Sequence, residues 1–210
     1  MKRSSAFTMI ELVFVIVVLG ILAALALPRM DRDLRQEAAD NVLSSLRYTQ
    51  HLALNDNKTD PFDTNWQQKL WSIHFTTATS GSYYNVSSDL DKSGLPAEKI
   101  ETAIDPANGK YMYHHHNNPV QANESPNVLL GKKYGVGSID FTGAGCSQKH
   151  IAFDQLGRPH NGIGSASNDY STYMNTDCNI TFSFGGSPNS FSIIIKKETG
   201  YAYIEGQPDS

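Results

Sequence analysis

The N-terminal stretch FTMIELVFVIVVLGILAALALP, residues 7–28, decides the architecture expected of this 210-residue chain. It is apolar apart from Thr8 and Glu11, and residues 12–27 carry no charge. As an α-helix with a rise of about 1.5 Å per residue, residues 7–27 would extend for about 30 Å, the thickness of the hydrocarbon core of a bilayer. We therefore expect a single membrane-spanning helix over residues 7–27.

Basic residues ahead of this helix predict its orientation. Lys2 and Arg3 should hold the start of the chain in the cytoplasm, so that everything after Pro28 is translocated. The whole sequence has a formal net charge of −4, and without Lys2 and Arg3 it would have 15 basic residues against 21 acidic ones. Because nucleic acids attract basic surfaces, nucleic acid is not an expected partner.

Glu11 is the exception within the apolar stretch. A carboxylate at this depth costs on the order of 3 kcal/mol and usually marks a functional partner. If the chain were cut between Ala6 and Phe7, the new α-amino group would lie one helical turn from Glu11. We hypothesise that this pair forms between neighbouring subunits, where it would neutralise both charges and set the axial register of the helices.

The segment Ala6-Phe7-Thr8-Met9-Ile10-Glu11-Leu12, after a short basic leader, resembles the processing site of type IV prepilins and type II secretion pseudopilins. The resemblance implies a leader at residues 1–6, cleavage between Ala6 and Phe7 by prepilin peptidase, and N-methylation of Phe7. Glu11 falls on the family's glutamate and Pro28 on its helix-curving proline. Ala6 departs from the family, which usually has Gly there, but a small residue is kept and we expect processing to survive.

The same resemblance implies a function in assembly. The chain would be a structural, minor subunit of a type II secretion pseudopilus or type IV pilus, held in the bacterial inner membrane with a cytoplasmic N-terminus and a periplasmic head. Its partners would be prepilin peptidase, other pilin or pseudopilin subunits, the inner-membrane assembly platform and membrane lipid. Phe7, Glu11, Gly20 and Pro28 are the candidate assembly residues. One alternative keeps the anchor but assigns the head to binding DNA or an exported substrate.

Two simpler interpretations of the N-terminus are a permanent anchor and a conventional signal peptide. Ala24-Leu25-Ala26 matches a small-residue cleavage site, after which an ordinary periplasmic β domain would begin at Leu27. Neither interpretation explains Glu11. The first residue of the mature protein separates them from the pilin-like interpretation, which predicts Phe7.

Residues 28–55 are expected to continue the helix with an amphipathic pattern. Pro28 removes a backbone donor and should bend or loosen the helix, and Gly20 adds a second soft point. Beyond Pro28, charged residues alternate with an apolar face that should pack on a head domain, and the turn-forming cluster at residues 55–57 should end the helix. The apolar face comprises Leu34, Ala38, Ala39, Val42, Leu43, Leu46 and Ala53.

Residues 56–210 are expected to form a periplasmic β-rich head, which makes the fold class α+β with a pilin-like long helix on an antiparallel sheet. The last two strands should form a hairpin with Gly200 in its turn. Residues 85–126 are less regular and are expected to form insertion loops. Short β-branched or aromatic runs between turn residues predict strands at residues 71–77, 111–115, 138–141, 150–153, 180–184, 192–196 and 201–204.

Two short patches of the head resemble H-type minor pseudopilins, which cap or initiate a short filament. They are IAFDQLGRP at residues 151–159, with Gly157 where a turn needs positive φ, and the Ile-rich final hairpin at residues 192–204. Cys146 and Cys178 are expected to form a disulfide if the head is exported, with two buried free thiols as the alternative. Such a bridge would stabilise the fold by about 3 to 4 kcal/mol.

The candidate chemistry of the head is limited. The segment DLDKSG at residues 89–94 resembles the start of a calcium loop, although Ile100 stands where an EF-hand needs a bidentate carboxylate. Some pseudopilins bind calcium through a head loop, so Asp89, Asp91 and Asp105 are kept as calcium candidates, and no other cofactor is expected.

Two further motifs carry no chemistry of their own. Of the histidines at 114–116, only His114 and His116 could share one face of a strand, and the sequence offers no third ligand for a metal. Basic pairs such as Lys132-Lys133 are expected to be solvated strand edges. Because the sequence also lacks a nucleophile elbow, a zinc-protease pair and a phosphate-binding loop, we do not expect an enzyme.

Overall fold

The computed structural model describes residues 8–79, 81–143, 145, 146, 148–165, 167, 170–186 and 189–210, without the side chains of residues 23–33. The chain divides into two compact units, Met1–Glu37 and Ala38–Ser210. Helix α1, Met9–Asn55, is continuous and contributes to both units. The second unit, which we call the head, contains all of the strands among the described residues.

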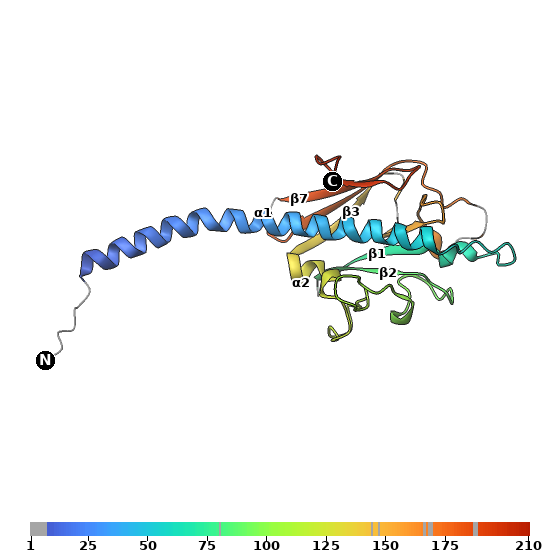
Figure 1. Cartoon of the computed structure of the whole chain (residues 1–210), viewed down its shortest axis with the longest axis horizontal. Coiled ribbons are helices and arrows are strands. Elements are labelled where there is room, and N and C mark those ends of the chain that lie inside the picture. The colour runs from blue at the N-terminus through green and yellow to red at the C-terminus, as the bar shows by residue number, and fades with distance from the viewer. Residues whose placement is uncertain are drawn as a thin grey trace. The chain divides into compact units, whose positions relative to one another are not determined.

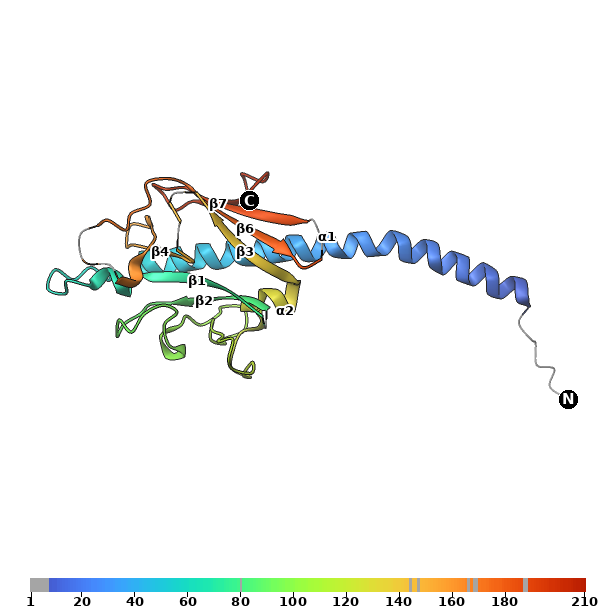
Figure 2. The same cartoon turned by 180° about the vertical axis from the view of Figure 1, so that it is seen from behind.

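The head is built from two four-stranded sheets in which every strand pair is antiparallel. The first sheet has the order β2-β1-β4-β5 and the second the order β3-β6-β7-β8 (Figures 1 and 2). The strands are β1 Trp71–Ala78, β2 Gly81–Ser87, β3 Val136–Thr142, β4 His150–Phe153, β5 Pro159–His160, β6 Cys178–Phe184, β7 Ser190–Ile195 and β8 Ala202–Ile204. The short helices are η1 Trp66–Lys69, η2 Lys99–Glu101, η3 Pro126–Val128, α2 Leu130–Tyr134 and η4 Ile163–Ser165.

Within the head, the part of α1 from Ala38 onward lies along both sheets, with β1 on one side and β7 on the other (Figure 1). The predicted apolar face is confirmed: its members from Ala38 to Ala53 are all buried in one core with residues of both sheets, whereas Leu34 is 40 % exposed. The sheets meet through aromatic rings, because Phe75 of β1 packs against Phe182 of β6 with ring centroids 5.6 Å apart. The helix ends at Asn55, as predicted.

Polar side chains of α1 also fasten it to the head. Ser45 Oγ and Tyr84 Oη are 2.8 Å apart and buried, and burial raises the pKa of Tyr84. Asn41 donates to the carbonyl oxygen of Asn127 at 2.9 Å, and Arg47 donates to that of Ala202 at 3.0 Å. Part of the polar face of the predicted amphipathic helix therefore contacts the head, and only the rest faces solvent.

The predicted core strands are confirmed, but the strand predicted at residues 111–115 is absent, and β2 and β5 were not predicted. Residues 111–115 form no strand; Tyr111 makes only isolated bridges, and its neighbour Met112 donates to Ala103 and accepts from Val86. This segment covers the outer edge of β2. Its aromatic residues therefore protect an edge strand and do not form a further strand of the sheet. Strand β2 itself was not predicted, because six of its seven residues are buried and no alternating pattern marks it.

Candidate functional site

Thr8 and Glu11 form a reciprocal set of hydrogen bonds at the start of α1. The amide and hydroxyl of Thr8 donate to Glu11 Oε2 at 3.3 and 3.2 Å, and the Glu11 amide donates to Thr8 Oγ1 at 3.4 Å. This arrangement is a capping box, whose sequence signal is Thr-x-x-Glu. The prediction for Glu11 considered its charge and did not include this signal. Ala6 and Phe7, the predicted cleavage pair, lie outside the described residues. The Glu11 carboxylate therefore accepts hydrogen bonds from Thr8 at the end of the helix where cleavage would create an amino group.

The helix that follows is apolar on all sides. Gly20 lies in open space, since a Cβ placed on it would meet nothing within 4 Å, so nothing described in this chain requires a glycine there. Among the described side chains, no helix offers a stretch long and apolar enough to span a membrane. The exposed apolar residues are Met9, Ile10, Leu12, Val13, Phe14, Val15, Ile16, Val17, Val18, Leu19, Ile21 and Leu22.

Pro28 falls inside α1, and the helix continues through it. Its side chain belongs to the stretch that the structure does not describe. The expected bend at Pro28 stays a prediction.

The two sequence patches of the head meet at one residue of α1. Gln50 Nε2 donates to the carbonyl oxygen of Gly157 at 2.8 Å and to that of Thr199 at 2.9 Å. Gly157 and Gly200 have φ of +76° and +66°, as expected for both turns, and a Cβ on Gly200 would lie 2.5 Å from the Gly157 oxygen. The β4–β5 turn, the β7–β8 turn and the helix therefore approach so closely that only glycine fits.

Asp154 shapes the first of these turns. Its buried carboxylate accepts from the amides of Leu156 and Arg158, both at 2.9 Å, and from Arg158 Nε at 2.8 Å. Burial opposes ionisation, but the nearby His160 ring, with Nε2 3.5 Å from Oδ2, and the hydrogen bonds from Arg158 outweigh it and lower the pKa of Asp154 to about 2. The patch 151–159 is thus a rigid turn that positions Gly157 against the helix.

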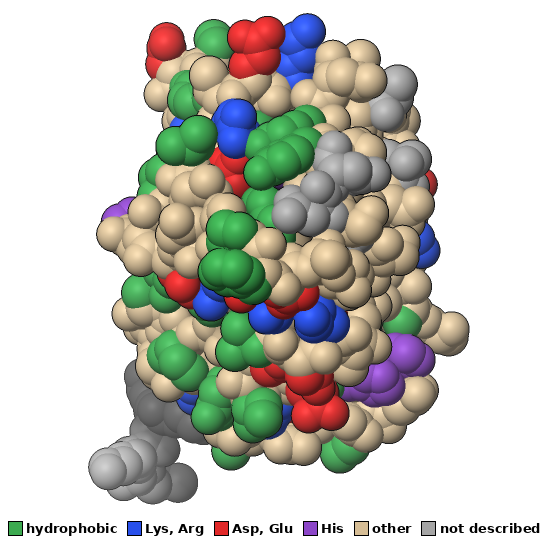
Figure 3. Space-filling view, turned by 90° about the vertical axis from the view of Figure 1, so that its right-hand side faces the viewer, with side chains coloured by type: hydrophobic (Ala, Val, Ile, Leu, Met, Phe, Trp, Pro, Cys, Tyr) green, Lys and Arg blue, Asp and Glu red, His purple; other side chains and the backbone are tan. Residues whose placement is uncertain are grey.

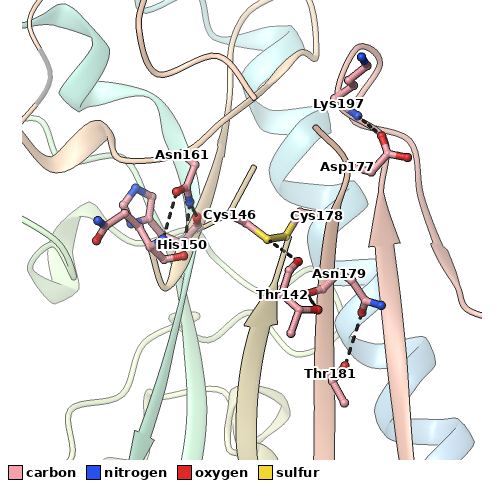
Figure 4. The surroundings of a disulfide bond; sticks show 10 residues. Thr142, Cys146, His150, Asn161, Asp177, Cys178, Asn179, Thr181 and Lys197 are labelled. Atoms are coloured by element: carbon pink, nitrogen blue, oxygen red, sulfur yellow. Dashed lines mark hydrogen bonds between the residues drawn. A yellow bond between two sulfur atoms is a disulfide. The ribbon is translucent and has the colours of Figure 1, made fainter. Parts of the chain in front are cut away.

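The predicted disulfide is present. Cys146 and Cys178 are bonded and fully buried, and they close a loop with a sequence separation of 32 residues (Figure 4). Cys146 belongs to the connection between β3 of the second sheet and β4 of the first, and Cys178 begins β6. The bridge therefore ties the crossover between the sheets to the middle of the second sheet.

The calcium candidates are only partly brought together. Asp89 and Asp91 lie with Glu101, and ligand atoms of these three carboxylates are within 4.8 Å of one another. Backbone amides already serve these groups, since Asp89 accepts from Ser93 and Gly94, and Glu101 accepts from residues 90 and 91.

Asp105 has a different position and role. Its buried carboxylate accepts from the Ser125 hydroxyl and from the side-chain amides of Asn108 and Asn127. Burial opposes ionisation, but these hydrogen bonds lower the pKa of Asp105. Asp105 holds loops together and does not belong to the cluster of Asp89, Asp91 and Glu101. Sequence spacing missed Glu101, because loop residues meet only in the folded chain.

The three consecutive histidines do not converge. His114 is buried, with Nδ1 3.2 Å from Glu124 Oε2, whereas the rings of His115 and His116 stack on each other nearer the surface. Basic side chains are equally scattered: Lys133 donates to Asn127, and Lys196 pairs with Asp177. On the face drawn in Figure 3, the described Lys and Arg side chains lie among acidic ones and form no continuous basic area.

A family model described as the prokaryotic N-terminal methylation motif matches residues 1–27. The match covers the predicted leader and apolar stretch and supports a type IV pilin-like family, with processing by prepilin peptidase and assembly with other pilin subunits. The α+β head with antiparallel sheets is compatible with a pilin-like fold. Neither curated proteins nor solved structures give a significant match to the chain.

Proposed function

We propose that this chain is a minor structural subunit of a type II secretion pseudopilus or a type IV pilus, and that it acts by assembly and not by catalysis. Prepilin peptidase would remove residues 1–6, and the mature chain would begin at an N-methylated Phe7. The observation that carries the proposal is the helix over residues 9–22, which exposes large apolar side chains on every face. An isolated helix of this kind is stable only inside lipid or among similar helices.

The exposed apolar side chains of this helix would be buried first in the membrane and then in the filament. Before assembly, the uncharged sequence of residues 12–27 would hold the subunit in the inner membrane with its head in the periplasm. After extraction by the assembly platform, the same side chains would pack against the helices of neighbouring subunits. An exposed glycine costs a helix about 1 kcal/mol relative to alanine, and Gly20 would repay this by allowing a neighbouring helix to approach closely.

Glu11 would exchange partners during this transfer. In the single chain its carboxylate accepts from Thr8, and the capping box satisfies amides at the helix start. In the filament, the Phe7 amino group of a neighbour would offer a positive charge, which makes a stronger hydrogen bond than a neutral donor does. The gain would be available only in one axial register, which is how a charge pair specifies an assembly.

The H-type assignment is a finer part of the proposal. It is supported by the way its two patches, 151–159 and 192–204, converge on Gln50. A head locked to its helix in this way would transmit the position of the helix to its own surface, which suits a subunit that occupies a defined place at a filament end.

The test is to produce the full chain together with prepilin peptidase and to determine its mature N-terminus by mass spectrometry. We expect a chain that begins at Phe7 and carries one methyl group. Ala6→Gly, which restores the usual family residue, should be processed at the same bond, and Phe7→Asp should block methylated product. A mature chain that begins at Leu27 would show an ordinary signal peptide and refute the proposal.

A further inference from the structure

A cavity of about 510 Å³ lies at the start of β4, away from the turn that holds Gln50. It lies within the head and includes two histidines that are direct partners across strands β1 and β4. None of its residues takes part in the contacts described above for assembly. The described residues that line it are His74, Leu95, Gln148, Lys149, His150, Gly162, Gly164 and Ser165.

Hydrogen bonding fixes the proton on His150. Its Nε2 lies 3.1 Å from the amide nitrogens of both Gly162 and Ile163, and an amide can only donate. Nε2 is therefore an acceptor, and the proton of the neutral ring must be on Nδ1. No described residue accepts a hydrogen bond from this Nδ1. His150 thus carries one donor, at Nδ1, and has no free lone pair, which excludes it as a metal ligand.

The charge of the lining also has one sign. Burial lowers the pKa of both His74 and His150 to about 4, so both rings are neutral at pH 7. Lys149 is exposed and close enough to His74 to contribute to this lowering. Among the described lining residues none is acidic, and Lys149 is the only one of them that is charged at pH 7.

We propose that this cavity binds a carboxylate group, held by the Lys149 ammonium and the Nδ1–H of His150, with the Gln148 amide and the Ser165 hydroxyl as further donors. A carboxylate accepts several hydrogen bonds and carries one negative charge, which matches one lysine. A phosphate monoester carries a charge of about −1.5 to −2 at pH 7 and would be left partly uncompensated.

The carboxylate could come from a free organic acid or from an acidic side chain of a polypeptide. A volume of about 510 Å³ lies within the usual range of ligand pockets, roughly 300 to 1,000 Å³, so either source fits. Leu95 supplies an apolar wall that would contact the carbon chain next to the carboxylate. The inference does not depend on the proposed assembly, because a chain that never forms filaments would still present this cavity.

The experiment is isothermal titration calorimetry on the full chain in a nonionic detergent, at pH 7 and constant ionic strength. Sodium butyrate represents the free acid and acetyl-Glu-amide the peptide, with butyramide and acetyl-Gln-amide as uncharged controls. We expect at least one acid to bind and its amide control not to bind, and whichever acid binds identifies the source. Binding by neither acid, or equal binding of an acid and its amide, would overturn the proposal.

Two charge-matched variants then locate the site. Lys149→Gln should weaken binding by about 10- to 100-fold, because it removes a hydrogen bond to a charged group. Lys110→Gln removes the same charge from a residue outside the cavity and should change affinity by less than about 2-fold. Equal affinities of the two variants would show that the acid binds elsewhere, and the assignment of this cavity would be wrong.

Discussion

The two units of this chain share one continuous helix, but its apolar side chains are exposed in one unit and buried in the other. In Met1–Glu37 the described apolar side chains of the helix are exposed, whereas from Ala38 onward its apolar face is buried to within a few per cent. The head is satisfied by its own residues, through a core, a disulfide and a dense set of hydrogen bonds. Among the described residues, the apolar side chains of residues 9–22 have no such core. Changes in the first unit should therefore affect assembly without affecting the stability of the head, and changes in the head should do the reverse.

The largest effect is expected from Glu11→Leu. Insertion and cleavage should survive, because the substitution removes a charge from an apolar helix, but filament formation should fall to a small fraction of the wild-type level through loss of the register pair. Filaments would be quantified by shearing and sedimentation, and the thermal midpoint of the head should not change.

A matched variant separates this role from capping. Thr8→Ala breaks the capping box at a cost of about 1 kcal/mol and keeps the Glu11 carboxylate. We expect it to assemble nearly as well as the wild type. If Thr8→Ala and Glu11→Leu reduced assembly equally, Glu11 would act as a cap alone.

The second prediction concerns the disulfide. Replacing Cys146 and Cys178 together by Ala should lower the free energy of unfolding of the head by about 3 to 4 kcal/mol and leave processing at Phe7 unchanged. Urea denaturation followed by tryptophan fluorescence measures the change, and reduction of the wild-type protein is the control. A loss below about 1 kcal/mol would mean that the two sheets hold their crossover without it.

The third prediction is a loss of head stability in mild acid. In the unfolded chain His74 and His150 have a pKa near 6.5, but in the head burial lowers both to about 4. Between these pH values the unfolded state binds more protons, so the free energy of unfolding falls as the pH drops from about 6.5 to about 4. We expect a loss on the order of 3 kcal/mol for each histidine.

His74→Gln provides the control for this pH dependence. It should reduce the slope between pH 6.5 and 4, while the contribution of Asp154, whose pKa is lowered from 3.8 to about 2, is lost only at lower pH. Urea denaturation at a series of pH values gives the slope. An unchanged slope in His74→Gln would show that other groups titrate in this window.

Features that depend on a local pattern could be predicted from the sequence. The buried helix face has helical spacing, and the strands at residues 180–184 and 192–195 are rich in β-branched and aromatic side chains. Strand β2 lacks such a pattern, since burial on both faces removes the alternation. The sequence could not show that Glu101, and not Asp105, joins Asp89 and Asp91 in the acidic cluster, because this depends on where distant loops meet.

Some features of the candidate assembly site could likewise be predicted from the sequence, and others required the fold. The charge of Glu11 within an apolar stretch and the length of that stretch, residues 7–27, can be read from the sequence alone, and the family match covers this segment. The capping box is also marked in the sequence, by the Thr-x-x-Glu pattern of Thr8 and Glu11. The convergence of two turns on Gln50 needed the fold, because the two turns lie 107 and 149 residues beyond Gln50 in the sequence.

The smallest expected effect is that of Gln50→Leu, which tests whether the head is locked to its helix. It removes two hydrogen bonds and leaves the carbonyl oxygens of Gly157 and Thr199 without this donor, so the free energy of unfolding should fall by about 1 to 2 kcal/mol. His51→Ala, next to it on the exposed side of the helix, should cost less than about 0.5 kcal/mol. If Gln50→Leu also reduced filament yield while the head stayed folded at the assay temperature, the comparison between the units would need revision. The helix would then be a joint through which the head takes part in assembly, and not a boundary between two independent parts.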